Sequence, residues 1–204
     1  PGAGAAGLHH GEAARRQRRA RRQEGLPPPR AARNKHVRAT LQGKRKAFGE
    51  LMDRVRRRDP AGHKPVVALF DGDGALDDML QQQLRAHGLS GRLEAMVLDI
   101  WHASEYVWEV GTALHGERNP RREVWVEDKL RALLHSKVGR VIGGRKQIAT
   151  KNRLTAAQAQ ALRKAVTYFE KHRHMMDYAT YLAKGYPLGT GQIEGACGGL
   201  VRDR

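Results

Sequence analysis

The stretch VVALFDGDGAL, Val66–Leu76, joins a short apolar run to a turn of aspartate and glycine. Such a run, bounded by such a turn, is typical of a buried strand that ends at Asp71-Gly72. Residues 73–87 have helical spacing, and LEAMVLDI, residues 93–100, predicts a second strand. A strand, a helix and a strand within about 35 residues predict a parallel βαβ unit, and hence a mixed α/β fold.

An amphipathic basic helix is predicted before this unit and ends at Asp59-Pro60. The apolar residues that fall near one face of this helix are Val37, Leu41, Phe48, Met52 and Val55. The opposite face is rich in lysine and arginine. The residues of this helix that we expect to bind the phosphate backbone of DNA are Lys44, Arg45, Lys46, Arg56, Arg57 and Arg58.

A block of helices is predicted after Asp99. Asn119-Pro120 has the form of a helix start, a further helix covers residues 137–149, and Thr155–Gln158 is a capping box. Gly185 suits the position after a helix at residues 174–184. We expect the aromatic residues of the first helix in the core, with stacking on unpaired DNA bases as the alternative; they are Trp101, Tyr106 and Trp108.

Composition points to a partner that is a polyanion. The chain has 204 residues and a formal net charge of +17, which favours nucleic acid as the partner. Cys197 is the single cysteine, so disulfides and a cysteine-based zinc site are excluded. The sequence has no apolar run of the roughly 20 residues that a membrane helix needs. These features predict a cytoplasmic, nucleoid-associated protein.

Residues 1–33 consist mainly of Gly, Ala, Pro and Arg, a composition that predicts a disordered basic tail. The arginine run of residues 15–22 suits phosphate binding, but it is also typical of a solvated tail or of readthrough from outside a reading frame.

Asp71 and Asp73 have three possible roles. In the first, the stretch is a turn in which Asp73 caps the following helix. In the second, Asp71 is the nucleophile and Asp73 the general acid of a haloacid-dehalogenase-like phosphatase. In the third, Asp71 is half of a metal site with Glu194, which lies 123 positions later (194 − 71) after the glycine hinge Gly189–Gly191.

The third role requires divalent cations. Carboxylates from separate parts of a chain can converge on two divalent ions about 3.5–4 Å apart that cleave phosphodiesters. Aspartate and glutamate oxygens are the ligands that Mg²⁺ (or Mn²⁺) prefers. Nucleases and transposases of the ribonuclease-H-like fold place acidic residues in this way.

Two segments carry a resemblance to a known family. They are Leu98–Trp108, LDIWHASEYVW, and Tyr186–Cys197, YPLGTGQIEGAC. With these segments, the chain from Asn34 onward resembles bacterial insertion-sequence transposases of the ISKra type. The resemblance implies an Asp-Asp-Glu triad on a ribonuclease-H-like fold, DNA as substrate and, for the complete enzyme, a dimer.

The resemblance also implies roles for individual residues. Asp71 corresponds to the second aspartate of the triad and Glu194 to the glutamate. Asp99, which is followed by His102, is the alternative to Asp71 if the strands are shifted by one. We expect His102 to be a helix-start or packing residue.

The expected parts of the chain follow from the same resemblance. They are a tail (1–33), a partial ribonuclease-H-like core (34–101), a helical insertion domain (102–185), and a hinge with the catalytic helix (186–204). The first triad aspartate and its strands have no counterpart here, so a truncated copy with little or no strand-transfer activity is expected.

Overall fold

A parallel pair of strands is the centre of the fold. The computed structural model describes residue 36 and residues 40–151 and 154–189. Strands β1 (Val66–Phe70) and β2 (Leu93–Leu98) pair in parallel, with Phe70 opposite Leu98. Helix α3 (Gly74–Ala86) and a short 3₁₀ turn connect them. The predicted βαβ unit and the mixed α/β class are therefore confirmed.

Helix α2 (Lys44–Arg58) packs on α3 beside the sheet, and it is shorter than the apolar pattern predicts. Gly43 has a φ of 86°, which is outside the helical region, and Leu41 is fully exposed. The prediction that Leu41 belongs to the buried face is therefore wrong. From Lys44 onward the pattern holds, since Met52 is buried in a small core with Phe70, Leu80 and Leu84.

Strand β2 ends at Leu98, two residues before the predicted end at Ile100. Asp99 is the N-cap of helix α4 (Ile100–His115), and its side chain accepts a hydrogen bond from the Trp101 backbone N–H. An aspartate that satisfies the first free N–H groups of a helix favours a helix start over continuation of the strand.

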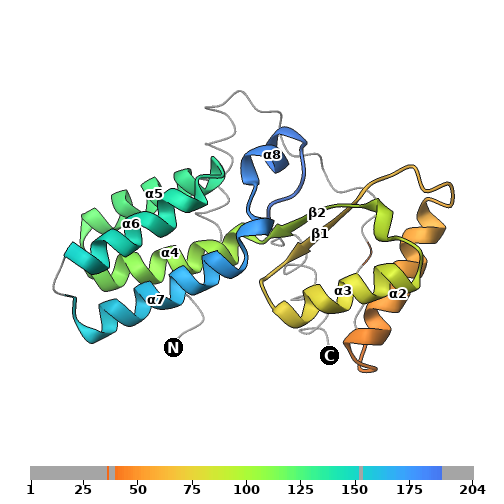
Figure 1. Ribbon diagram of the computed structural model, residues 1–204, viewed down its shortest axis with the longest axis horizontal. Helices are drawn as coiled ribbons and strands as arrows, with labels where there is room; N and C mark the ends of the chain where they lie inside the picture. The colour runs from red at the N-terminus through yellow and green to blue at the C-terminus, as the bar shows by residue number, and fades with distance from the viewer. Residues whose placement is uncertain (1–35, 37–39, 152–153, 190–204) are drawn as a thin grey trace.

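Four helices form a bundle beside the sheet. They are α4, α5 (Pro120–Leu134), α6 (Val138–Lys151) and α7 (Ala156–Lys171), and Figure 1 shows them on the side of the molecule opposite to α2 and α3. Close approach of α4 and α5 depends on Gly111, where an added Cβ would lie 2.7 Å from Val126 Cγ2. Apolar residues of β2 and of the bundle form one continuous core. This core crosses the border expected between residues 101 and 102.

The predicted helix ends are largely confirmed. Asn119 caps α5 with Pro120 in its first turn, and Thr155 and Gln158 form the capping box of α7. Gly185 has a φ of 72°, as a residue after a helix end often does.

The helix predicted over residues 174–184 is instead two pieces. A 3₁₀ turn (Arg173–Met175) is followed by α8 (Tyr178–Ala183), and Asp177 lies between them outside the helical region. The Asp177 carboxylate accepts a hydrogen bond from Ser136 Oγ, which in turn accepts one from the Ala179 backbone N–H. This tertiary contact interrupts the helix.

Helix α8 returns the chain to β2. The Tyr178 hydroxyl donates to the Leu98 carbonyl at 3.0 Å, and the Tyr181 hydroxyl donates to the Met96 carbonyl at 3.1 Å. Both phenols thereby use carbonyl groups on β2 as acceptors, which fixes the helical part of the chain to the sheet.

The aromatic residues of α4 lie largely as predicted. Trp101 is buried, whereas Tyr106 and Trp108 are partly buried and pack against the core. None of the helices in the described part of the chain combines the length and the apolar character needed to cross a membrane.

Candidate functional site

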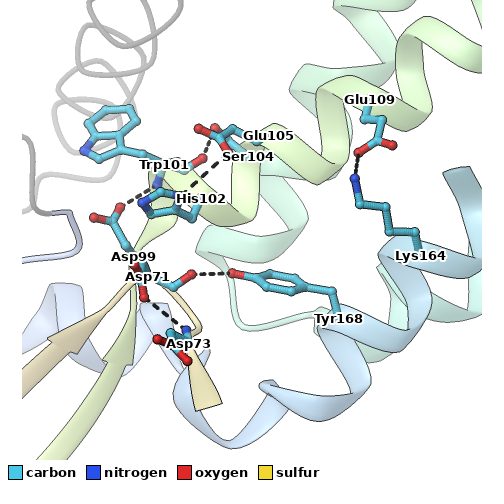
Figure 2. Close-up of polar contacts among 10 residues, drawn as sticks. All are labelled: Asp71, Asp73, Asp99, Trp101, His102, Ser104, Glu105, Glu109, Lys164 and Tyr168. Atoms are coloured by element: carbon cyan, nitrogen blue, oxygen red, sulfur yellow. Dashed lines mark hydrogen bonds and ion pairs between the residues drawn. The ribbon is translucent and has the colours of Figure 1, made fainter. Parts of the chain in front are cut away.

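Asp71 and Asp99 lie side by side at the carboxyl edge of the sheet. Each follows the last residue of its strand, and those last residues, Phe70 and Leu98, are register partners. The Asp99 backbone N–H donates to the Phe70 carbonyl at 2.6 Å. Neighbouring parallel strands are about 4.8 Å apart. The two aspartates that the sequence left as alternatives are thus neighbours in space (Figure 2).

Asp71 is exposed in a loop that two hydrogen bonds hold in place. Its Oδ1 accepts from the Asp73 backbone N–H at 3.0 Å, and its backbone carbonyl accepts from the Tyr168 hydroxyl at 3.0 Å. Gly72, next in the chain, has a φ of 95°. Figure 2 shows Tyr168 reaching this loop from α7. The loop presents a carboxylate to solvent in a defined orientation.

Asp73 has the predicted role of a helix cap. One carboxylate oxygen accepts from the Ala75 backbone N–H at 3.0 Å, and the other lies 2.9 Å from the Lys44 ammonium. The hydrogen bond from Lys44, with the one from Ala75, lowers the pKa of Asp73. A general acid must be protonated near the working pH. An aspartate whose pKa is lowered is therefore poorly suited to the acid role that a phosphatase needs.

Asp99 is fully buried, unlike Asp71. Its Oδ1 accepts from the Trp101 backbone N–H at 2.7 Å, and Figure 2 shows the carboxylates of Asp71 and Asp99 turned toward different backbone amides. His102 lies in the first turn of α4 and pairs with Glu105 at 3.6 Å, which agrees with the expected helix-start position. The geometry favours Asp71 over Asp99 as a group that can meet a ligand.

The C-terminal hinge begins beside Asp99. The Ile100 backbone N–H donates to the Leu188 carbonyl at 2.8 Å, so residue 188 is fixed at the carboxyl edge of the sheet. Gly189 lies so close to the Trp101 indole that an added Cβ would collide with it. Gly191 and Glu194 lie outside the described residues.

Tyr168 supports the Asp71 loop and His172 packs against Tyr168, and sequence reasoning missed both. The ring of Tyr168 stacks on Tyr106 with centroids 3.8 Å apart, and burial raises the pKa of its phenol well above the usual range, so the hydroxyl remains a donor. His172 is buried with Nδ1 2.8 Å from the Tyr168 carbonyl, and burial lowers its pKa. No local signal marks Tyr168, because its contact with Asp71 spans 97 positions.

The lowered pKa of His172 predicts a loss of stability in acid. Below the ordinary histidine pKa of 6.5, the unfolded chain takes up a proton that the folded chain resists. Unfolding free energy should therefore fall as pH drops from 7.5 to 5.5, by at most about 1.4 kcal/mol per pH unit from this residue. His172→Gln should flatten the dependence of melting temperature on pH, measured by circular dichroism.

The exposed His63 provides the control for this prediction. His63→Gln removes one histidine without removing a buried one, and the variant should keep the pH dependence of the wild type. An equal flattening in both variants would contradict the role assigned to His172.

The basic residues predicted to bind DNA lie on α2. Lys44 pairs with Asp73 near the Asp71 loop, whereas Arg56, Arg57 and Arg58 are exposed in the last turn of the helix. At 1.5 Å per residue, that turn lies about 20 Å along the axis from Lys44. The described residues thus place Arg56, Arg57 and Arg58 away from Asp71, whereas Arg45 and Lys46 are exposed in the first turn beside Lys44.

The described residues do not form a complete metal site. Across residues 40–151 and 154–189, no three side chains of His, Cys, Asp or Glu come together as a metal site would require. The exposed Asp71 carboxylate fits one oxygen ligand of a hard divalent ion.

Comparison of the chain with protein families, with curated proteins and with solved structures finds no match.

Proposed function

We propose that this chain is a DNA transposase of the two-metal, ribonuclease-H-like class, in which Asp71 and Glu194 hold the divalent ions. One observation supports this most. Asp71 is an exposed carboxylate at the carboxyl edge of a parallel sheet, and the chain returns to the same edge at Leu188. The carboxyl edge of such a sheet is where α/β proteins bind ligands.

The position of Leu188 limits how far Glu194 can lie from this edge. Six residues separate the two (194 − 188). Even a fully extended chain of that length spans no more than about 21 Å. Covalent connectivity is therefore compatible with Asp71 and Glu194 acting together, although they are 123 positions apart (194 − 71) in sequence.

Each residue of the Asp71 loop has a part in this proposal. The Asp73 N–H holds Oδ1 of Asp71 and so orients the carboxylate, while the Tyr168 hydroxyl holds the backbone carbonyl. Bound Mg²⁺ or Mn²⁺ would supply the activation of a water or a 3′-hydroxyl and the stabilisation of the leaving oxygen. Asp99 positions the start of α4 and is not assigned as a ligand.

The same residues also bear on two other functions, a phosphatase and a nucleic-acid-binding remnant without catalytic activity. A phosphatase needs Asp73 as an acid, but the hydrogen bond from Lys44 lowers the pKa of this carboxyl group, which opposes that role. Hydrolysis of p-nitrophenyl phosphate that disappears in Asp71→Ala would favour the phosphatase. A nucleic-acid-binding remnant would bind DNA in a salt-dependent way without binding a divalent ion at Asp71.

Binding of Mn²⁺ by the 204-residue chain tests the proposal directly. We expect the wild type to bind Mn²⁺ in electron paramagnetic resonance titrations. Asp71→Asn and Glu194→Gln should each weaken the binding of Mn²⁺ by at least about tenfold. Loss of a residue that only orients a metal ligand already lowers metal affinity by about tenfold or more, and loss of the ligand itself should lower it at least as much.

Asp73→Asn is the matched control, because it makes the same chemical change two positions away and retains an oxygen that caps α3. This variant should bind Mn²⁺ as the wild type does. Unchanged Mn²⁺ binding in Asp71→Asn would contradict the assignment of Asp71 as a ligand. Absence of Mn²⁺ binding in the wild type would favour the nucleic-acid-binding remnant.

A further inference from the structure

An open groove runs along α7 and ends at the Asp71 loop. Its volume is about 540 Å³. We call it the α7 groove and define it by Gly72, Tyr106, Arg163, Lys164, Thr167 and Lys171. Gly72 follows Asp71 directly, so one end of the groove adjoins the carboxylate that the proposed function places at the scissile phosphate.

The α7 groove is basic. Arg163, Lys164 and Lys171 line it, and no carboxylate is among its lining residues. Lys164 pairs with Glu109 at 2.8 Å, so its charge is partly balanced. Arg163 and Lys171 are exposed, and within the described residues neither has an ion pair within 4.0 Å. Both cations can attract an anion, although the charge of Lys171 also acts on the nearby Asp73 carboxylate and Arg163 has no such neighbour among the ion pairs of the described residues.

The spacing of these cations suits a strand of nucleic acid. Arg163, Thr167 and Lys171 are four residues apart in turn and so lie near one face of α7. Arg163 and Lys171 are about 12 Å apart along the helix axis. Two cations this far apart on one face of a helix can contact different phosphates of the same strand, because the rise per nucleotide is much smaller than this separation.

The floor of the α7 groove is aromatic and is fixed to the Asp71 loop. Tyr106 stacks on Tyr168 with an angle of 13° between the rings, and the Tyr168 hydroxyl donates to the Asp71 carbonyl. The faces of these rings are already occupied, because the Lys164 ammonium lies over the Tyr106 ring, 5.3 Å from its centroid, and His172 lies against Tyr168. The rings therefore fix the shape of the groove, and its cations are the groups left to contact a ligand.

We propose that the α7 groove binds the DNA strand that leads to Asp71, with its phosphates on Arg163 and Lys171. This inference rests on the proposed function, because Asp71 gives the strand its end point. It assigns the DNA contacts near Asp71 to residues of α7. The arginines in the last turn of α2 lie away from Asp71 and are not part of this groove.

The test is binding of a fluorescein-labelled, single-stranded 20-nucleotide DNA to the full chain in EDTA, followed by anisotropy at several salt concentrations. Arg163→Ala with Lys171→Ala should weaken binding about tenfold and reduce the steepness of log affinity against log salt by about 1.4, since each phosphate contact with a single strand contributes about 0.7. Arg121→Ala with Arg131→Ala on α5 removes the same charge from the opposite side of the bundle (Figure 1) and should change the slope little.

Two results would overturn the inference. The first is an equal loss of affinity in the α7 and α5 double variants, which would mean that only net charge matters. The second is displacement of the DNA by polyglutamate of equal charge at the same concentration as by unlabelled DNA. DNA binding is measured in EDTA and Mn²⁺ binding is measured without DNA. DNA binding at the α7 groove can therefore fail while Mn²⁺ binding succeeds, and the reverse.

Discussion

Gly72→Ala is expected to lower the melting temperature by roughly 6–12 °C, or about 3 kcal/mol of unfolding free energy. Two costs add. The φ of 95° at Gly72 is in a region that residues with a Cβ rarely adopt, which costs about 1 kcal/mol. An added Cβ would also lie 2.7 Å from the Tyr168 hydroxyl oxygen. Moving that hydroxyl away breaks its hydrogen bond to the Asp71 carbonyl, which costs roughly 1–2 kcal/mol of unfolding free energy.

Gly88→Ala separates these two costs. Gly88 has a φ of 67° but nothing within 4 Å of an added Cβ, so this variant carries the conformational cost alone. It should lower the melting temperature by roughly 2–4 °C. Adding Tyr168→Phe to Gly72→Ala removes the oxygen that the Cβ meets and should recover part of the loss, which a double-mutant cycle measures. Equal losses at Gly72 and Gly88 would contradict the close contact with Tyr168.

Gly72→Ala also tests whether the conformation of the Asp71 loop affects the binding of Mn²⁺. Tyr168 connects α7 and the α7 groove to the Asp71 carbonyl. If that connection orients the carboxylate, Gly72→Ala should weaken Mn²⁺ binding even at temperatures where the variant is folded.

Sequence reasoning found the features that depend on nearby residues. These features include the apolar run Val66–Phe70, the helical spacing after it, and the caps at Asn119 and Thr155. Each of them depends only on residues that are close in the sequence. Strand and helix periodicity and the chemistry of side chains that accept backbone N–H groups are local properties. Local rules therefore predicted the βαβ unit and most helix starts.

Features that depend on tertiary contacts were not predictable. The sequence presented Asp71 and Asp99 as alternatives, because the register that makes them neighbours is fixed only when β1 and β2 pair. Helical spacing at residues 174–184 could not reveal that Asp177 is held by Ser136, 41 positions earlier. Leu41 matched the apolar face of α2 but lies beyond Gly43, where the helix begins.

The basic residues illustrate the same limit. A run such as Arg56–Arg58 stands out in sequence, whereas Arg163 and Lys171 are separated by eight positions (171 − 163) and attract no notice. Only the packing of α7 against α4 and the contact of Tyr168 with Asp71 bring the latter pair to the candidate site. Density of charge along the chain is thus a poor guide to which cations lie near a candidate site.

Asp99→Ala is the second substitution with a large expected effect, at roughly 2–4 kcal/mol. The carboxylate is fully buried and accepts the Trp101 backbone N–H at 2.7 Å. Its loss removes an N-cap and leaves a backbone donor unpaired away from water. The melting temperature should fall by roughly 6–12 °C in thermal unfolding followed by circular dichroism.

Asn119→Ala removes the equivalent cap of α5, where the Arg121 N–H is exposed and water can replace the lost acceptor. This control should cost only about 1 kcal/mol. A loss at Asp99 no larger than the loss at Asn119 would show that burial of the cap is unimportant.

Asp99→Asn distinguishes a structural role from metal binding at this position. The amide keeps an oxygen that can accept the Trp101 N–H, so stability should fall by less than about 1 kcal/mol. Because Asp99 is buried and Asp71 is exposed, Asp99→Asn should also retain Mn²⁺ binding, while Asp71→Asn loses it. The reverse result, in which Mn²⁺ binding survives in Asp71→Asn and is lost in Asp99→Asn, would transfer the ligand role to the strand end at β2.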